Sequence, residues 1–154
     1  MSRLSSEEYK GVYKMNTVTD FVKRVGRQNE EMGWRDNYLK LEAVILEHAP
    51  ELLPILQNYA AAAMIALIHS EVSEALEGLR KGLNDDHLPH RKMAEAEMAD
   101  AFIRECDFMD FIKKYMKGYE HTDLEATTVE KMLYNKTRAD HKPENRAKEG
   151  GKKF

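Results

Sequence analysis

The chain has 154 residues, of which 42% are hydrophobic and 33% are charged, and its formal net charge is −3. These values are typical of one soluble globular domain, and they exclude a global basic field that would attract nucleic acid. Cys106 is the single cysteine, which excludes an intramolecular disulfide and favours a reducing compartment. No apolar run reaches the roughly 18 residues of a membrane span, and the first residues lack the apolar core of a signal peptide. We therefore expect a cytoplasmic protein that binds neither nucleic acid nor a membrane.

In the first half of the chain, apolar residues recur at helical spacing, and glycine and proline mark the ends of the segments. The first helix is predicted over about residues 18–32, with Thr17 or Thr19 as its N-cap and Gly33 at its end. A second, shorter helix is predicted within residues 34–49.

Two long helices are predicted next. The first covers about residues 50–79, and Pro54 fits its first turn. Residues 83–90 contain Asn, Asp, Pro and His, which are typical of a loop. The second long helix covers about residues 91–116, and Gly118 is expected to stop it.

The last predicted helix follows Thr122, which we expect to be its N-cap. Residues 139–154 are polar and are expected to form a flexible tail. No segment shows strand alternation, so the sequence predicts an all-α fold, a helical bundle of four to five helices. We expect one domain with a core over about residues 17–138.

Two pairs of acidic residues lie on the two long predicted helices: Glu71 with Glu74, and Glu97 with Asp100. Each pair has a spacing of three residues, which places both members on one helix face. Both pairs border apolar stripes, so two antiparallel helices can bring the four acids together between them. Carboxylates clustered near a core repel one another unless cations lie between them. Oxygen-only ligands suit Mg²⁺, and Mn²⁺ is an alternative.

The acidic pairs have a simpler explanation as well, because Glu-x-x-Glu arises often by chance in a highly charged chain. A solvated acidic face would need no metal ion. Arg104 is placed to reach Asp100 across one turn, but a single arginine cannot neutralise four acids. This favours a metal site over a purely structural cluster.

A third group of polar residues lies on the last predicted helix. Lys131, Asn135 and Arg138 have spacings of four and three, so they share a face. A cation, an amide and a guanidinium suit phosphate oxygens. The alternative is a solvated basic face near a helix C-terminus, where the helix dipole favours cations.

Taken together, these motifs resemble those of the MazG-like, all-α nucleoside triphosphate pyrophosphohydrolases, which are related to the dimeric dUTPases and the dCTP pyrophosphatases. The hallmark of that family is Glu-x-x-Glu, a variable gap, and then Glu-x-x-Asp. Here the two pairs match it, with 22 residues between them. The family's later Lys-x-x-x-Asn-x-x-Arg pattern matches residues 131–138, and its basic Gly-Gly-Lys ending is similar to residues 150–152.

The chain also departs from the family. The stretch over residues 35–59 is longer than in the compact members. Lys81 and Arg104 stand where dCTP pyrophosphatases have an aromatic residue and a tyrosine that contact the nucleoside. The base specificity of that branch is therefore not expected here.

The resemblance implies hydrolysis of a nucleoside triphosphate, either a ribo- or a deoxyribonucleotide, to a monophosphate and pyrophosphate. About two Mg²⁺ ions would be held by Glu71, Glu74, Glu97 and Asp100, and any one of the glutamates can instead serve as general base. Lys131, Asn135 and Arg138 would hold the phosphates, and Lys152 or Lys153 would close over them. Trp34, the sole tryptophan, is a base-stacking candidate, although it can equally be a packing residue at a helix end.

Relatives of this kind form homodimers or homotetramers, so the same is expected here. The row Met109, Ile112, Met116 and the alanine run over residues 60–63 are candidates for the contact between copies. A di-iron carboxylate bundle is excluded because no histidine follows a glutamate by three residues. The remaining alternative is non-catalytic: a helical adaptor or regulatory bundle that keeps the acids as a structural cluster.

Overall fold

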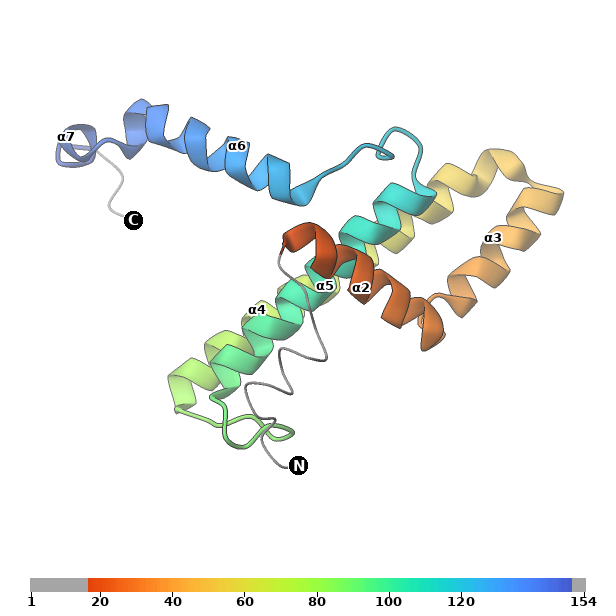
Figure 1. The fold of residues 1–154 in the computed structure, drawn as a ribbon, viewed down its shortest axis with the longest axis horizontal. Coiled ribbons are helices and arrows are strands. Elements are labelled where there is room, and N and C mark those ends of the chain that lie inside the picture. The colour runs from red at the N-terminus through yellow and green to blue at the C-terminus, as the bar shows by residue number, and fades with distance from the viewer. Residues whose placement is uncertain (1–16, 151–154) are drawn as a thin grey trace. The chain divides into compact units, whose positions relative to one another are not determined.

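The computed structural model describes residues 17–150, and within them it contains helices and no strand (Figure 1). The all-α prediction is therefore confirmed. The elements in chain order are α2 (Val18–Glu31), α3 (Asp36–His48), the 3₁₀ helix η1 (Pro50–Leu52), α4 (Leu53–Lys81), α5 (Met93–Tyr115), α6 (Leu124–Thr137), the 3₁₀ helix η2 (Ala139–His141) and α7 (Pro143–Arg146).

The chain divides into two compact units, the first ending at Thr122 and the second beginning at Asp123. The first unit contains α2 to α5, and the second contains α6, η2 and α7. Both acidic pairs lie in the first unit, whereas the Lys131, Asn135 and Arg138 group lies in the second.

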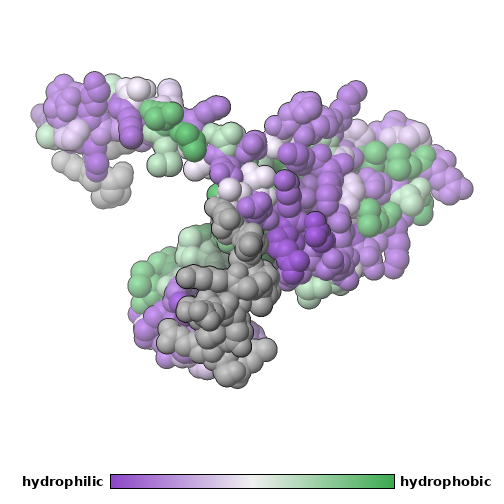
Figure 2. Space-filling view, in the orientation of Figure 1, coloured by the Kyte–Doolittle hydropathy of each residue, from purple (hydrophilic) through white to green (hydrophobic). Residues whose placement is uncertain are grey.

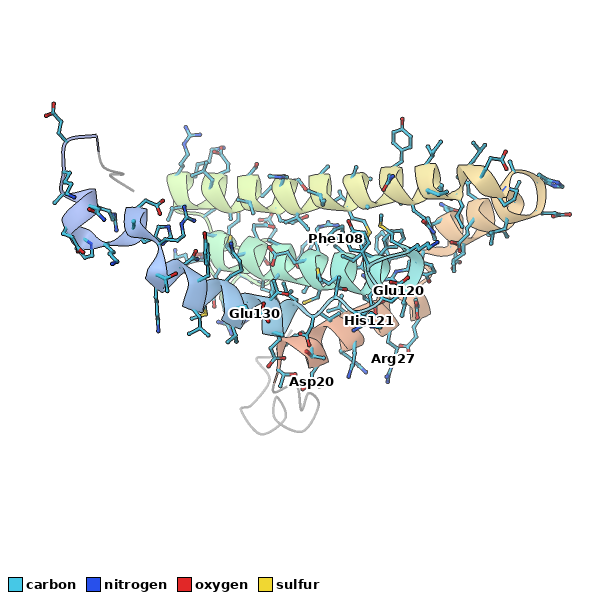
Figure 3. All side chains as sticks on the ribbon, turned by 90° about the horizontal axis from the view of Figure 1, so that it is seen from above. Asp20, Arg27, Phe108, Glu120, His121 and Glu130 are labelled. Carbon is cyan, nitrogen blue, oxygen red and sulfur yellow. The ribbon has the colours of Figure 1, made fainter. Side chains whose placement is uncertain are left out.

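The two long helices α4 and α5 form the centre of the first unit and lie side by side (Figure 3). They are antiparallel, because Gln57 near the start of α4 donates a hydrogen bond to the carbonyl oxygen of Tyr115 at the end of α5. At the opposite end, Gly78 of α4 lies against Met93, the first residue of α5. This antiparallel arrangement is the one that brings residues near 71 and 97 to the same level of the pair.

Gly78 is needed for the close approach of α4 and α5. A Cβ atom added there would lie 2.8 Å from Cβ of Met93 and 3.1 Å from the backbone nitrogen of Ala94. The backbone cannot move aside as a flexible side chain can, so the helices must separate. We expect Gly78→Ala to destabilise the protein by about 1–3 kcal/mol despite the better helix propensity of alanine. Urea denaturation measures this, and Ser73→Ala on the exposed face of the same helix is the control, since its effect should stay within about 0.5 kcal/mol. Equal stability of the two variants would contradict the close packing.

The core of the first unit forms between α4 and α5, around Ala61, Phe111 and Ile112. Phe108 lies between the two helices as well (Figure 3). The row that contains Ile112, and the alanine run that contains Ala61, were expected to supply a surface between copies of the chain. That expectation is wrong for these buried residues, because they pack inside one subunit; Met109 and Met116 are partly buried against the same core.

Helix ends follow the predicted chemistry with one correction. Thr17 is the N-cap of α2, and its side chain accepts a hydrogen bond from the amide of Asp20. For α6 the cap is Asp123 and not Thr122; the carboxylate of Asp123 accepts a hydrogen bond from the amide of Ala126.

The polar segment after α6 was expected to form a flexible tail, but residues 139–146 form η2 and α7. The side-chain amide of Asn145 donates to the carbonyl of Ala139 and joins the two short helices.

One face of α4 is apolar and exposed. Leu76 and Leu79 are exposed near its end, and Ile55 and Tyr59 are exposed near its start. Figure 2 shows apolar residues gathered on the surface of the first unit, at the end of α4 that leads into the loop and near α3. The stretch Pro50–Lys81 is also the one described helical segment that is long and apolar enough to cross a membrane by length and composition alone, which is weak evidence for a span.

Candidate acidic metal site

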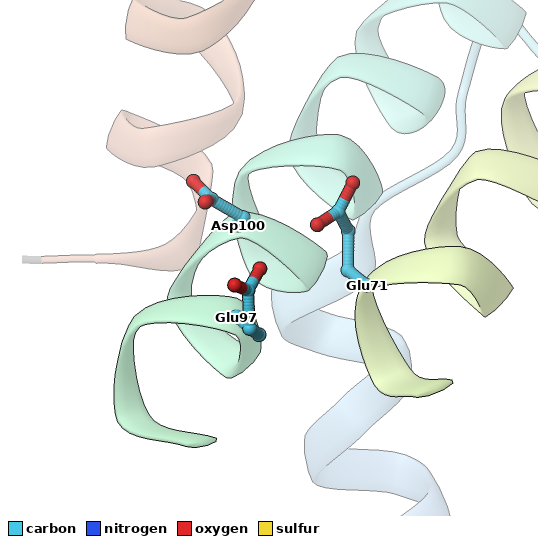
Figure 4. Close-up of side chains that lie close together, drawn as sticks. All are labelled: Glu71, Glu97 and Asp100. Carbon is cyan, nitrogen blue, oxygen red and sulfur yellow. The ribbon is translucent and has the colours of Figure 1, made fainter. Parts of the chain in front are cut away.

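Three of the four predicted acids meet between α4 and α5. Glu71 reaches from α4 toward Glu97 and Asp100, which lie one turn apart on α5 (Figure 4). One carboxylate oxygen of each residue lies within 4.8 Å of the corresponding oxygens of the other two. Glu71 and Glu97 are buried, and Asp100 is exposed. The cluster is therefore half enclosed, and Asp100 forms its open side.

Glu74, the fourth predicted acid, lies outside this group of three. It is exposed on α4, one turn beyond Glu71. Its charge still acts on the cluster, because it helps to raise the pKa of Glu97. Glu74 can thus take part in a larger constellation of acids, but it is not one of the three whose oxygens already converge.

The cluster is electrostatically unfavourable when all its members are ionised. Burial raises the pKa of Glu97 above its usual 4.5, and so do a hydrogen bond with Glu71 and the charges of neighbouring acids. Burial and the charge of Glu71 likewise raise the pKa of Asp100 above 3.8, although Arg104 acts in the opposite direction. A divalent cation would relieve this repulsion, and an all-oxygen donor set from two helices fits Mg²⁺ or Mn²⁺.

These raised pKa values predict how stabilisation by a divalent cation at the cluster would depend on pH. At pH values between the pKa of these groups in the unfolded chain and their raised pKa in the native state, Glu97 and Asp100 bind more protons in the native state than in the unfolded state. The contribution of Glu97 and Asp100 to stability therefore falls as pH rises through that window. Metal needs the ionised carboxylates. We therefore expect the rise in melting temperature caused by Mn²⁺ to grow as the pH is raised from about 4 toward about 7. Differential scanning fluorimetry at a series of pH values checks this, and a rise that does not change with pH would contradict it.

Arg104 donates a hydrogen bond to one acid of the cluster. Its Nε donates to Oε1 of Glu71 at 2.5 Å, and it lies one turn after Asp100 on α5. The side chain of Glu71 is buried, whereas that of Arg104 is 41% exposed. The spacing in the sequence predicted a contact between Arg104 and Asp100 on the same helix, but the hydrogen bond of Arg104 is with Glu71 on α4.

A cavity of about 570 Å³ adjoins the cluster, and its lining includes Asp100 and also Arg104, which is hydrogen-bonded to Glu71. All four helices of the first unit contribute to its lining. Aromatic and apolar walls come from Trp34, Tyr38 and Phe111, and the amide of Asn29 adds a polar group. Trp34 is strongly exposed, which distinguishes it from a packing residue at a helix end. Predominantly apolar walls with a few polar groups are typical of small-molecule sites.

A buried ion-pair network lies beside the cavity, and the sequence did not reveal it. The guanidinium of Arg35 donates to Oδ1 of Asp107 at 2.6 Å and to Oδ2 of Asp110 at 2.9 Å. Lys114 approaches the same oxygen of Asp110 at 3.0 Å. Asp107 and Asp110 are a further pair of acids with a spacing of three residues, and this spacing was the signal available in the sequence. Arg35 pairs with both of these carboxylates, so their charge is better neutralised than that of the cluster at Glu71.

The remaining predicted substrate-binding residues lie in the second unit. Lys131 and Asn135 are on α6, and the Lys131 ammonium lies 5.1 Å from the centre of the Tyr134 ring. Arg138 follows the helix and forms two hydrogen bonds with the carboxylate of Asp140. The predicted closing lysines, Lys152 and Lys153, are outside the described residues.

Comparison with known proteins gives no significant match: no protein-family model, no curated protein and no solved structure is similar to this chain.

Proposed function

We propose that the protein is a Mg²⁺-dependent nucleoside triphosphate pyrophosphohydrolase, which converts its substrate to a monophosphate and pyrophosphate. The observation that carries this proposal is the convergence of Glu71, Glu97 and Asp100 from two antiparallel helices beside a cavity. Its support is chemical, because these carboxylates repel one another and one arginine contact leaves most of their charge uncompensated. The sequence motifs that resemble those of MazG-like enzymes add to this support.

Glu71, Glu97 and Asp100 would hold Mg²⁺, with Glu74 as a further ligand or as a base one turn away. When bound, the ion supplies charge neutralisation on the phosphate chain and acidification of a coordinated water. The chain's own residues bind and orient the substrate. Burial of Glu71 and Glu97 excludes bulk water from one side of the cluster, and the exposure of Asp100 leaves the other side open to substrate.

The cavity beside the cluster would hold the nucleoside. Trp34 and Tyr38 supply aromatic surfaces for stacking, and Asn29 supplies an amide that can both donate and accept hydrogen bonds. Its volume of about 570 Å³ falls within the usual range of about 300–1,000 Å³ for small-molecule sites. The Lys131, Asn135 and Arg138 group is proposed as the phosphate-binding element, on the strength of its chemistry and spacing.

A panel of ribo- and deoxyribonucleoside triphosphates, incubated with the protein and millimolar Mg²⁺, tests the proposal. We expect equal amounts of monophosphate and pyrophosphate from the preferred substrate, and no product after chelation with EDTA. Release of orthophosphate alone would contradict cleavage between the α and β phosphates.

The second candidate is a helical adaptor, and the exposed apolar face of α4 favours it. The same face also supports our proposal that the enzyme is a homodimer or homotetramer, since Leu76 and Leu79 would be covered by another copy. Multi-angle light scattering distinguishes these two arrangements: an adaptor without its partner is expected to be monomeric, and the proposed enzyme is not.

A further inference from the structure

Arg104 belongs to the acidic cluster and to the cavity at the same time. Its Nε donates to Glu71, and its side chain lines the cavity with Trp34 and Tyr38. We propose that Arg104 is an exchangeable counter-ion. Its guanidinium pairs with Glu71 when the cluster holds no metal. When a divalent ion binds Glu71, the guanidinium moves to a phosphate group in the cavity. This inference rests on the proposed metal site and gives Arg104 a direct contact with a phosphate group.

The contact with Glu71 is one that a metal ion must disturb. Arg104 donates to Oε1 of the buried Glu71 carboxylate, so a metal ion bound to Glu71 would share this carboxylate with the guanidinium. The guanidinium charge also acts on Asp100, a second acid of the cluster. A divalent cation that approaches Glu71 and Asp100 therefore competes with Arg104 for an acceptor and is repelled by its charge.

The cavity offers Arg104 a second position. Its side chain is 41% exposed, so reorientation does not require the core to open. The ion pair with Glu71 that the structure describes is made through Nε. Planar guanidinium groups bind phosphate oxygens through paired donors. A phosphate group beside the cluster would thus draw Arg104 away from Glu71.

This exchange predicts positive coupling between metal and phosphate. Metal binding releases Arg104 for the phosphate, and phosphate binding removes the cation that competes with the metal. By thermodynamic linkage, each ligand raises the affinity of the other by the same factor. A fixed structural ion pair would contribute no such coupling, because Arg104 would stay on Glu71 in every state.

Isothermal titration of Mn²⁺ into the full chain tests the first half of the exchange. We expect Arg104→Gln to bind Mn²⁺ about tenfold more tightly than the wild type, because the competing charge is absent. Arg104→Lys keeps the charge and should stay close to the wild-type affinity, which also controls for folding. Arg80→Gln removes an exposed cation that pairs with Glu77, and it should change the affinity less than about twofold.

Titration of inorganic phosphate tests the second half. Without divalent ions, Arg104→Gln should weaken phosphate binding less than about twofold, because in the wild type the contact that Arg104 gains with phosphate is offset by the contact that it loses with Glu71. With saturating Mg²⁺, the same substitution should weaken phosphate binding by about fivefold or more. An equal loss with and without Mg²⁺, or an unchanged Mn²⁺ affinity in Arg104→Gln, would overturn the exchange while leaving the metal site intact. Absence of Mn²⁺ binding in both proteins would overturn the metal site and the exchange together.

Discussion

Replacing Glu97 by glutamine is expected to stabilise the metal-free protein and to abolish hydrolysis. The carboxylate of Glu97 is buried beside Glu71 and Asp100, so removal of its charge relieves repulsion that raises its own pKa. The same change replaces one of the three converging carboxylates by a neutral amide, which would be a much weaker ligand for a divalent ion. We expect kcat/KM to fall by more than about a hundredfold, and the rise in melting temperature caused by Mg²⁺ or Mn²⁺ to disappear.

The opposite signs of these two effects make the test specific. A variant that is merely misfolded would lose both stability and activity, whereas Glu97→Gln should gain the first and lose the second. Glu105→Gln, an exposed substitution on the same helix, is the matched control and should change neither property. Full activity in Glu97→Gln, or an unchanged metal-dependent rise in melting temperature, would contradict the assignment of Glu97 to the metal site.

Arg35→Ala is expected to have the largest effect on stability. Arg35 is buried, and its guanidinium neutralises Asp107 and Asp110 at once. Removal of the arginine leaves Asp110 buried, with the partly exposed Lys114 as its remaining ion-pair partner within residues 17–150. Breaking a buried pair in this way costs about 3–5 kcal/mol. The guanidinium also lies 6.0 Å from the centre of the Phe111 ring, so some packing is lost as well.

Urea denaturation at neutral pH measures this effect. The control is Arg80→Ala, which removes an exposed ion pair with Glu77 and should cost less than about 1 kcal/mol. Arg35→Lys keeps the charge but not the planar fork, so its stability should fall between those of the wild type and Arg35→Ala. A loss in Arg35→Ala no larger than that in Arg80→Ala would show that the network does not hold α5 against the segment before α3.

The helices of this protein could be predicted because their signals are local. The capping of α2 by Thr17 and the start of α4 near Pro54 follow from residues within one or two turns of each boundary. The end of α4 was predicted at about residue 79, but the helix continues to Lys81 and Gly82 is its C-cap. The cap of α6 was misplaced by one residue, since Thr122 and Asp123 are both good caps and adjacent in the sequence. The two short helices after α6 were not predicted, because the polar composition of this segment favoured a flexible tail and the helix-start signal of Pro143 was not used.

The acidic site could be predicted only as far as spacing on single helices allows. Spacing placed Glu97 and Asp100 on one face, and the register of α4 against α5 then determined that Glu71, and not Glu74, meets them. That register depends on contacts such as Gly78 against Met93, which no local pattern reveals. The pairing of Arg35 with Asp110 spans 75 positions in the sequence, so it too required the folded chain.

The most direct test is to crystallise the protein with millimolar MnCl₂ and to collect data at the manganese absorption edge. The account predicts an anomalous peak among the carboxylates of Glu71, Glu97 and Asp100, and no such peak in crystals of Glu97→Gln. An acidic cluster without anomalous density, with Arg104 still bound to Glu71, would contradict the metal site and the function proposed from it.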